Sequence, residues 1–485
     1  MDTIDYKGIY FLDITGRNDW SSALIYGNGT GQTSYFYPSV GGSWLFVQGL
    51  RDVMPEFISF GKLRASYAVV GRDCAPYLTT GTGYYMFDNT FDNPLDKQTY
   101  PYYKFDADEL PNLNLKPEKQ HAVELGLDMR FLNNRLGFDF AWYKTNTKNQ
   151  ILNLPVASES GVSSRWINAG NIQNSGIELL VTATPIETDD WHWDLSFNLT
   201  RNRNKIISLA EGVEKYQLKG GGIDTQAWAT VGGAYGDIYT SYGYKRNENG
   251  EKLLNADGSY IRSNESVKIG SIQPKFLWGM TTSLSWKGIT FNAVVDARFG
   301  GDIFSGSYYY GMNSGNIASS LAGRDTQYGG LERPLTDGTG RVANDGVIPD
   351  GVFQDGSVIK GVDVSGKSYQ EAYEAGLVDP LSAYKYYDNV YGWSGGIREE
   401  GIHKCSWIAL RELSLHWQLP KKWVQKVYMQ NVNVGLVCRN VGFLYNSLPD
   451  NIHPEGLNTT YSSEYLESGG AVFSRNIGFN VNVSF

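Results

Sequence analysis

The sequence predicts an all-β protein, an antiparallel transmembrane β-barrel, and three observations support this prediction. Apolar and polar residues alternate along many segments, so each segment would present one apolar and one polar face as a strand. Short polar turns and long loops join these segments in alternation, which is typical of outer-membrane barrels. The composition contains 56 glycines and 14% aromatic residues but only 19% charged residues, as expected for strands connected by many turns.

The composition also argues against several other classes of protein. The 485 residues carry a net charge of −9, which is opposite to the basic stripe of a nucleic-acid-binding protein. No run of about 18 apolar residues is present, so a transmembrane helix is not expected. The three cysteines show no C-x-x-C spacing and do not predict a disulfide framework. The first residues lack the basic and apolar regions of a secretory signal.

The first predicted strands occupy residues 6–17, 35–47 and 61–72. In the third of these, Leu63, Ala65, Tyr67 and Val69 hold every second position, which is the period of a strand with one apolar face. A long loop rich in Gly, Pro, Tyr and Asp follows and continues to about residue 116.

The clearest predicted hairpin joins residues 123–131 to residues 136–142. Both segments alternate strictly between apolar and polar residues, and the turn Asn133-Asn134 reverses the chain between them. A second hairpin is expected from 177–186 and 191–200, joined by the polar turn 187–190.

A third hairpin is expected from residues 276–286 and 289–299, joined at Lys287-Gly288. The last strands are expected near 406–419, 427–446 and 472–485, after a long loop from about residue 304 to 404. In total we expect roughly 12 strands, each long enough to cross a bilayer as a tilted strand.

Charged residues on the polar faces indicate what those faces meet. Glu124, Asp128, Arg130, Asp139 and Glu178 fall at the positions that alternate with the apolar ones. A packed protein core would require a partner for each of these charges, whereas a water-filled lumen solvates them. They are therefore expected to line the lumen of the barrel.

Two longer motifs resemble the TonB-dependent receptors, and in particular their SusC/RagA branch. The first is Pro111–Glu118 leading into Glu124–Asp128, and the second is Asn168–Leu179. Further similar segments are Gly16–Asp19, Gly61–Tyr67, Arg439–Val441 and the terminal Phe485, which matches the assembly signal of outer-membrane proteins. The resemblance spans nearly the whole chain.

The resemblance implies a multi-pass barrel of about 22 strands in the outer membrane of a Gram-negative bacterium. An N-terminal plug would fill this barrel, and a TonB box would connect it to the TonB complex. A SusD-like surface lipoprotein would close over its outer mouth. The imported nutrient is an oligosaccharide in many members of the family and a peptide in others, and no enzymatic activity or cofactor is implied.

The chain departs from this family pattern at its N-terminal side. Nothing similar to a plug or a TonB box precedes Met1, and roughly 12 of the expected strands are present. Residues 1–485 are therefore expected to form the C-terminal portion of the barrel, as a fragment or a truncated gene product.

Motifs of enzymes and metal sites lack the context that they need. Gly392-Trp393-Ser394-Gly395-Gly396 fits the nucleophile elbow G-x-S-x-G but lies in a glycine-rich loop. The five histidines form no i, i+4 pair, so a catalytic zinc is not expected. Asp345, Asp350 and Asp355 lack the spacing of a calcium loop and favour a solvated acidic loop.

The residues expected to contact substrate are aromatic side chains on the long extracellular loops. Their flat apolar rings suit the C–H faces of sugars, although packing within the loops or against the lid protein is the more common role of a tyrosine. The candidates are Tyr84, Tyr85, Tyr308, Tyr309, Tyr310, Tyr391, Trp393 and Tyr461.

Import of an oligosaccharide through the barrel is therefore the leading hypothesis, and three alternatives stay open. A peptide importer of the same family would bind its cargo mainly through backbone pairing. A passive pore would result if the fragment closed on itself, and a truncated gene would leave an inactive remnant of a transporter. A soluble carbohydrate-binding β-protein would direct the apolar faces toward a core instead of lipid.

Overall fold

The structure is a computed structural model that describes residues 2–26, 29–76, 78–79, 85–92, 99–105, 109–110, 112, 114–156, 162–470 and 474–485. It consists of two compact units, which we describe separately. The first comprises residues 1–216, 230–234 and 278–292, and the second comprises residues 217–229, 235–277 and 293–485.

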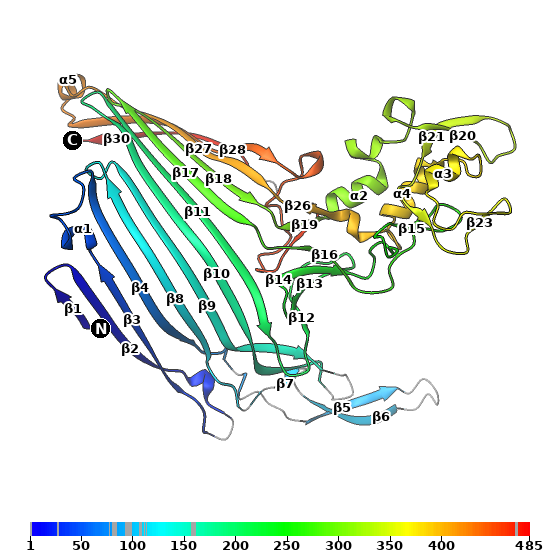
Figure 1. Cartoon of the computed structure of the whole chain (residues 1–485), viewed down its shortest axis with the longest axis horizontal. Helices are drawn as coiled ribbons and strands as arrows, with labels where there is room; N and C mark the ends of the chain where they lie inside the picture. Colours follow the sequence, from blue (N-terminus) through cyan, green and yellow to red (C-terminus); the bar gives the residue numbers. More distant parts are fainter. Residues whose placement is uncertain are drawn as a thin grey trace. The chain divides into compact units, whose positions relative to one another are not determined.

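The first unit is built on long antiparallel strands that follow one another in sequence order (Figure 1). In the order of the sheet they are β1 (Asp2–Tyr6), β2 (Tyr10–Trp20), β3 (Ser34–Trp44), β4 (Ile58–Arg72), β8 (Glu118–Phe131), β9 (Leu136–Pro155), β10 (Ser164–Glu187), β11 (Trp191–Ser208) and β17 (Phe276–Trp286). Smaller elements of this unit are η1 (Ser22–Leu24), α1 (Phe46–Gly49), β5 (Tyr85–Asp92), β6 (Thr99–Phe105) and β7 (Glu109–Leu110).

Two tight turns show why the chain reverses where the sequence predicts it. Between β8 and β9, Asn133 and Asn134 have φ angles of 56° and 68°, a left-handed conformation that asparagine tolerates well. Between β17 and β18 (Ile289–Phe299), Lys287 and Gly288 have φ angles of 46° and 86°. The β17–β18 turn has two residues, and its two positive φ angles match the right-handed twist of the flanking strands. The β8–β9 loop is longer, because Phe131 pairs with Leu136 and Leu132 also has a positive φ, of 53°.

Apolar residues of the strands are exposed on one face of the sheet. Val123 and Leu125 on β8 are exposed, as are Leu63 on β4 and Leu136 on β9, and the strand pairing places all four on the same face. A continuous apolar face of this size would aggregate in water, whereas the hydrocarbon of a bilayer solvates it. The long strands therefore form the wall of a membrane barrel.

The opposite face of the wall carries paired charges. The guanidinium of Arg64 donates two hydrogen bonds to Asp139, at 2.8 and 3.2 Å, and its Nε lies 3.5 Å from Glu124. All three side chains remain partly exposed, as expected for residues that line an aqueous lumen.

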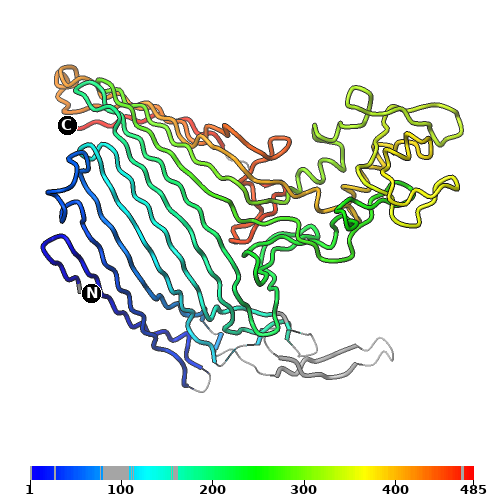
Figure 2. The backbone as a smooth tube through the Cα atoms, viewed as in Figure 1, coloured from blue at the N-terminus to red at the C-terminus, as the bar shows by residue number. Residues whose placement is uncertain are grey.

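The second unit contains the last wall strands and the long loops. Its wall strands are β18, β27 (Trp407–Gln418), β28 (Asn431–Asn446) and β30 (Asn476–Ser484), in this order. Leu436 of β28 and Phe479 of β30 are paired, and both side chains are exposed. Figure 2 follows the chain from these strands into the loops of residues 302–404, which carry most of the helices of this unit.

The loops of the second unit form short sheets and helices of their own. Four short strands form one sheet, β12 (Lys215–Gln217), β13 (Thr225–Thr230), β14 (Tyr235–Thr240) and β16 (Val267–Ser271). The other strands are β15 (Leu253–Leu254), β19 (Asp302–Ser305), β20 (Leu331–Pro334), β21 (Val342–Val347), β22 (Val352–Phe353), β23 (Val358–Ile359), β24 (Val362–Asp363), β25 (Leu381–Ser382), β26 (Ile402–Lys404) and β29 (Leu466–Glu467).

The helices of these loops are short. They are α2 (Gly306–Ser314), α3 (Tyr369–Glu374), α4 (Ala383–Tyr391) and the 3-10 turns η3 (Ala318–Leu321), η4 (Thr326–Tyr328), η5 (Arg398–Gly401) and η7 (Pro449–Asn451). The turn between β27 and β28 contains α5 (Lys421–Val424) and η6 (Gln425–Val427). No helix of the described residues is both long and apolar enough to span a membrane.

Several strand bounds differ from the predicted ones. The predicted strands 136–142 and 191–200 continue to Pro155 in β9 and Ser208 in β11, and the predicted strand 35–47 ends at Trp44, before α1. Residues 6–17 form parts of two strands, because Lys7 and Gly8 adopt φ angles of 60° and 64° and turn the chain between β1 and β2. The predicted strand 177–186 is the end of β10, which begins at Ser164. The predicted start at residue 427 is wrong, because Tyr428 has a φ of 60° and β28 begins only at Asn431.

Candidate functional site

Five of the eight predicted aromatic residues come together in the second unit. Tyr308, Tyr309 and Tyr310 lie on α2, Tyr391 ends α4, and Trp393 follows two residues later. Tyr391 contacts Tyr308 and Tyr309 with ring centroids 6.2 and 5.3 Å apart. Tyr310 and Trp393 are stacked, with centroids 4.9 Å apart and planes at 29°.

The burial of these five rings separates them into an inner and an outer group. Tyr309 is fully buried and Tyr391 is nearly so, whereas Trp393 is 73% exposed and Tyr310 is half-buried. A ligand in solvent can therefore reach the Trp393–Tyr310 stack. The buried Tyr309 ring packs against Tyr310 on the inner side of this stack.

The other three candidates are placed elsewhere. Tyr461 lies in the loop before β29 and is exposed. Tyr85 begins β5, where it is paired with Phe105, and its side chain lies outside the described part of the structure. Tyr84 lies outside the described residues altogether.

Both helices that carry the aromatic residues begin at serine caps. Ser305 accepts a hydrogen bond from the backbone N–H of Tyr308, at 3.1 Å, and Ser382 accepts one from Lys385, at 3.1 Å. The first helix ends at Gly315 in the left-handed conformation, with a φ of 73°, which favours glycine. These caps set where each ring leaves its helix.

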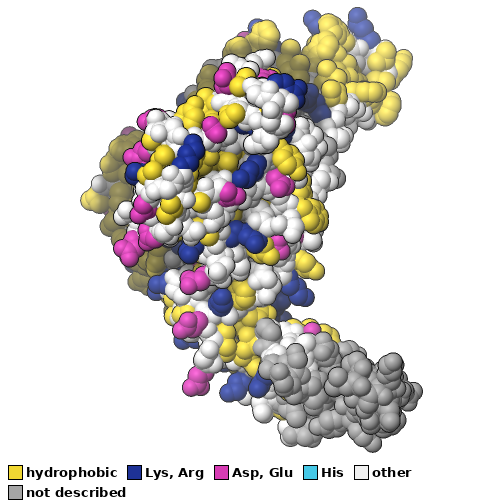
Figure 3. All heavy atoms as spheres, turned by 90° about the vertical axis from the view of Figure 1, so that its right-hand side faces the viewer, with side chains coloured by type: hydrophobic (Ala, Val, Ile, Leu, Met, Phe, Trp, Pro, Cys, Tyr) yellow, Lys and Arg dark blue, Asp and Glu magenta, His cyan; other side chains and the backbone are white. Residues whose placement is uncertain are grey.

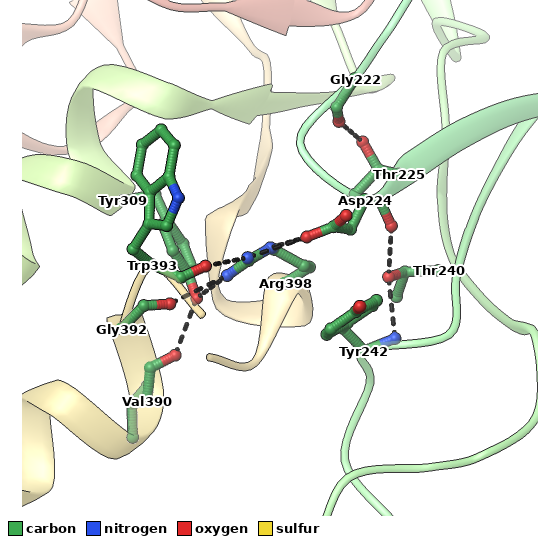
Figure 4. A network of polar contacts seen from close by, with 10 residues as sticks. All are labelled: Gly222, Asp224, Thr225, Thr240, Tyr242, Tyr309, Val390, Gly392, Trp393 and Arg398. Carbon is green, nitrogen blue, oxygen red and sulfur yellow. Dashed lines mark hydrogen bonds and ion pairs between the residues drawn. The ribbon is translucent and has the colours of Figure 1, made fainter. Parts of the chain in front are cut away.

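One buried arginine, Arg398, connects the loops around the inner rings (Figure 4). It is only 2% exposed. Its Nη2 and Nε donate hydrogen bonds to Asp224 Oδ2 at 2.9 and 3.1 Å. It also donates to the carbonyl oxygens of Gly392, at 3.3 Å, and Trp393, at 2.9 Å.

The phenol of Tyr309 completes this network. It accepts a hydrogen bond from Arg398 Nη1 at 2.6 Å and donates one to the carbonyl oxygen of Val390 at 3.0 Å. The guanidinium carbon of Arg398 also lies 5.0 Å from the Tyr309 ring centroid and 5.4 Å from that of Tyr242. Burial raises the pKa of Tyr309 to about 12, so the phenol stays protonated and can donate.

The network holds the backbone that presents the exposed indole. The carbonyl groups of residues 390, 392 and 393 each accept a hydrogen bond from the Arg398–Tyr309 pair. The Trp393 side chain therefore projects from a fixed backbone, and a ligand that stacks on it does not have to order the loop first.

A second group of aromatic residues surrounds Lys252. Its ammonium lies 4.1 Å from the ring centroid of Tyr244 and 3.4 Å from Glu400 Oε1. The Tyr244 phenol donates to Glu400 at 2.7 Å, and the Tyr244 and Tyr260 rings are in edge contact at 4.8 Å. Burial, together with the nearby Glu400 charge, raises the pKa of Tyr244. These contacts stabilise the loops and leave no free ring face for a ligand.

The remaining sequence motifs are explained by local structure. The G-x-S-x-G segment at 392–396 follows helix α4 and precedes η5, so it is not a strand–turn–helix elbow. Asp345 forms an ion pair with Arg333 at 2.7 Å. Within the described ranges, no three His, Cys, Asp or Glu side chains are grouped so that they could hold a metal ion.

The exposed apolar wall, the tight turns and the elaborate loops fit one protein family. The family described as "TonB dependent receptor-like, beta-barrel" matches residues 1–270. The chain belongs to the TonB-dependent receptors. The predicted family, the β-barrel fold and the location in the outer membrane are thereby confirmed. The soluble β-protein is excluded, and the family is one of transporters instead of enzymes.

Curated relatives and solved structures support this assignment. TonB-dependent receptor P3 of Formosa agariphila is 28% identical over 326 residues, which cover 62% of this chain and 31% of the relative. TonB-dependent receptor SusC of Bacteroides thetaiotaomicron is 28% identical over 335 residues, which cover 64% and 31%. The chain thus matches about a third of the length of these relatives.

The fold is similar to that of a solved importer. The RagAB peptide importer in its closed-closed state aligns over 100% of this chain and 47% of that chain, with a TM-score of 0.66 and 18% identity. The same importer in its open-open state aligns with the same TM-score. At this level of identity the likeness shows the fold of the wall and loops.

Proposed function

We propose that this chain provides part of the barrel wall and the outer loops of an importer that takes up an oligosaccharide across the outer membrane. The observation that carries the proposal is the exposed indole of Trp393, stacked on Tyr310 and held by the Arg398 network. A flat apolar ring supported in this way fits the C–H face of a pyranose.

Polar groups next to the platform suit the hydroxyl groups of a sugar. Ser394 follows Trp393 and is exposed. The Arg262 guanidinium lies beside Gly395, where a Cβ atom would be 3.3 Å from its Nη1, and above the Tyr242 ring at 5.0 Å. An aromatic face flanked by a hydroxyl and a guanidinium offers both stacking and hydrogen bonds.

The import would require partners that the family resemblance implies. A SusD-like lipoprotein would close over the outer loops, and the TonB complex would act through an N-terminal plug and TonB box. A peptide is the second candidate cargo, because a structure with a similar fold is that of the RagAB peptide importer. A peptide would depend more on backbone hydrogen bonds than on the indole face.

The test is to remove the platform and measure binding. In the full-length receptor, W393A is expected to weaken oligosaccharide binding about tenfold, as expected for the loss of one stacked aromatic contact. Isothermal titration calorimetry against a panel of oligosaccharides and of peptides measures the effect.

The matched control is Y384A, which removes a tyrosine that is 76% exposed on α4 but does not stack on Trp393. It should leave the affinity unchanged. Unchanged oligosaccharide affinity in W393A would contradict the proposal, and a receptor that binds only peptides from the panel would replace it by the peptide alternative.

A further inference from the structure

The turn between β27 and β28 differs in charge from the rest of the protein. Residues 420–430 contain Lys421, Lys422 and Lys426 and no acidic residue, although the chain as a whole carries a net charge of −9. By contrast, the turn between β10 and β11 at 187–190 contains three acidic residues and one threonine. The positive charge is therefore a local property of one short turn.

These three lysines are exposed and have no ion pair among the described residues. Lysines of other short turns have partners. Lys287 lies 3.2 Å from Asp190, and the Lys7 ammonium lies 5.2 Å from the ring centroid of Tyr6. The α5–η6 turn thus presents three unpaired ammonium groups to its surroundings.

Large apolar side chains accompany the lysines. Trp423 and Val427 are more than half exposed, and Tyr428 is 93% exposed. The turn is nevertheless a fixed structure. Val424 is buried, the Trp423 ring meets Trp417 of β27 edge-on at 6.0 Å, and the backbone N–H of Gln430 donates to the carbonyl of Ser484, at 2.8 Å.

The apolar side chains of the turn continue the lipid-facing surface of the wall. Leu415 and Trp417 on β27 and Val481 and Val483 on β30 are exposed next to it. Figure 1 shows α5 at the end of these strands, beside the C-terminal end of β30. Short turns of outer-membrane barrels lie on the periplasmic side, so this turn meets the headgroups of the inner leaflet.

We propose that the α5–η6 turn is a binding site for anionic phospholipid headgroups of the periplasmic leaflet. Lys421, Lys422 and Lys426 supply the charge that a phosphatidylglycerol-type headgroup requires. Trp423 and Tyr428 sit at the boundary between headgroup and hydrocarbon, where amphipathic rings are favoured. Charge complementarity and continuity with the lipid-facing wall both select a lipid over a soluble anion.

A patch of charges of one sign is not typical of the surface that Figure 3 shows. On the face that it displays, acidic and basic side chains are interspersed. Interspersed charges largely cancel at the distance of a headgroup, whereas three lysines within six residues add.

The test uses the full-length receptor in vesicles of phosphatidylcholine with a trace of spin-labelled lipid. Electron paramagnetic resonance gives the association of labelled phosphatidylglycerol with the protein relative to labelled phosphatidylcholine. We expect a several-fold preference for phosphatidylglycerol that decreases with added salt. In K421Q/K422Q/K426Q the preference should fall close to one, and in K421R/K422R/K426R it should persist.

The control is K7Q/K287Q, which removes two lysines that already have partners in other short turns. It should keep the preference. The proposal is overturned if the triple glutamine variant, folded by circular dichroism, retains the wild-type preference, or if the wild type shows none. A second measurement is the co-sedimentation of the receptor with purified peptidoglycan. The proposal is also overturned if replacing the three lysines weakens this co-sedimentation and leaves the lipid preference unchanged.

Discussion

Each of the two units contains an arginine–aspartate ion pair, and the two pairs have similar lengths but differ in burial. In the wall of the first unit, Arg64 lies 2.8 Å from Asp139, and both side chains stay in contact with solvent. In the loops of the second unit, Arg398 lies 2.9 Å from Asp224, but the guanidinium is almost completely buried. Distance alone therefore does not indicate how much either pair contributes.

The difference lies in what replaces each pair when it is broken. Water in the lumen can solvate Arg64 or Asp139, so the wall loses little. Arg398, by contrast, also donates to two backbone carbonyl groups and a buried phenol, and these groups would lose their donor. A buried polar group without a partner costs far more than a solvated one.

The largest expected effect is that of R398A. Because it leaves the Gly392 and Trp393 carbonyl groups and the Tyr309 phenol oxygen without their donor, it should destabilise the loops around the platform by about 3–5 kcal/mol. Hydrogen exchange of residues 390–400 measures this opening directly. Protection that equals the wild type would show that the network is not required.

A smaller effect is expected from the phenol of Tyr309. Its pKa in the folded protein, about 12, is above the usual value for tyrosine of about 10, so the protonated form is favoured by folding. The resulting stability is complete below about pH 10 and is lost as the pH rises toward 12. Absorbance of tyrosinate at 295 nm, with proteolysis of the loops, follows this loss.

The variant Y309F removes this titration and two hydrogen bonds of the phenol. It should cost about 1–2 kcal/mol at neutral pH and make the loops less sensitive to alkali. Tyr384, which is largely exposed, provides the matched control as Y384F. An unchanged alkaline profile in Y309F would assign the opening to other buried tyrosines.

The smallest effect is expected from R64A in the wall. The pair with Asp139 is partly exposed to the lumen, so its loss should cost no more than about 1 kcal/mol. The midpoint of barrel unfolding in urea measures it. A cost that approaches that of R398A would show that the lumen face of the wall is drier than its exposure indicates.

Much of the wall was predictable, and the exceptions have local causes. The β8–β9 hairpin matches its prediction because strict alternation continues up to the asparagine turn. The start of β10 was missed because residues 168–176 are mostly polar on both faces, so the alternation disappears there. The turn at Lys7-Gly8 was missed because alternation continues after it, through Tyr10, Leu12 and Ile14.

The candidate site was predictable only in part. Sequence reasoning selected the aromatic residues of the long loops, and five of them converge. It missed Arg398 and Asp224, which are 174 residues apart in the chain and have no local pattern in common. An arginine beside two glutamates at 399 and 400 looks like a solvated turn until the fold buries it.

The wall strands, the turns at residues 133–134 and 287–288 and the family could all be inferred from the sequence alone. A strand repeats every two residues, so ten neighbouring residues are enough to show which face meets lipid. Only the tertiary structure decided which rings are available to a ligand. Tyr309 and Trp393 are both loop aromatics in sequence, but one is buried under Arg398 and the other is exposed above Tyr310. Burial in the loops depends on contacts between distant segments, which no local pattern encodes.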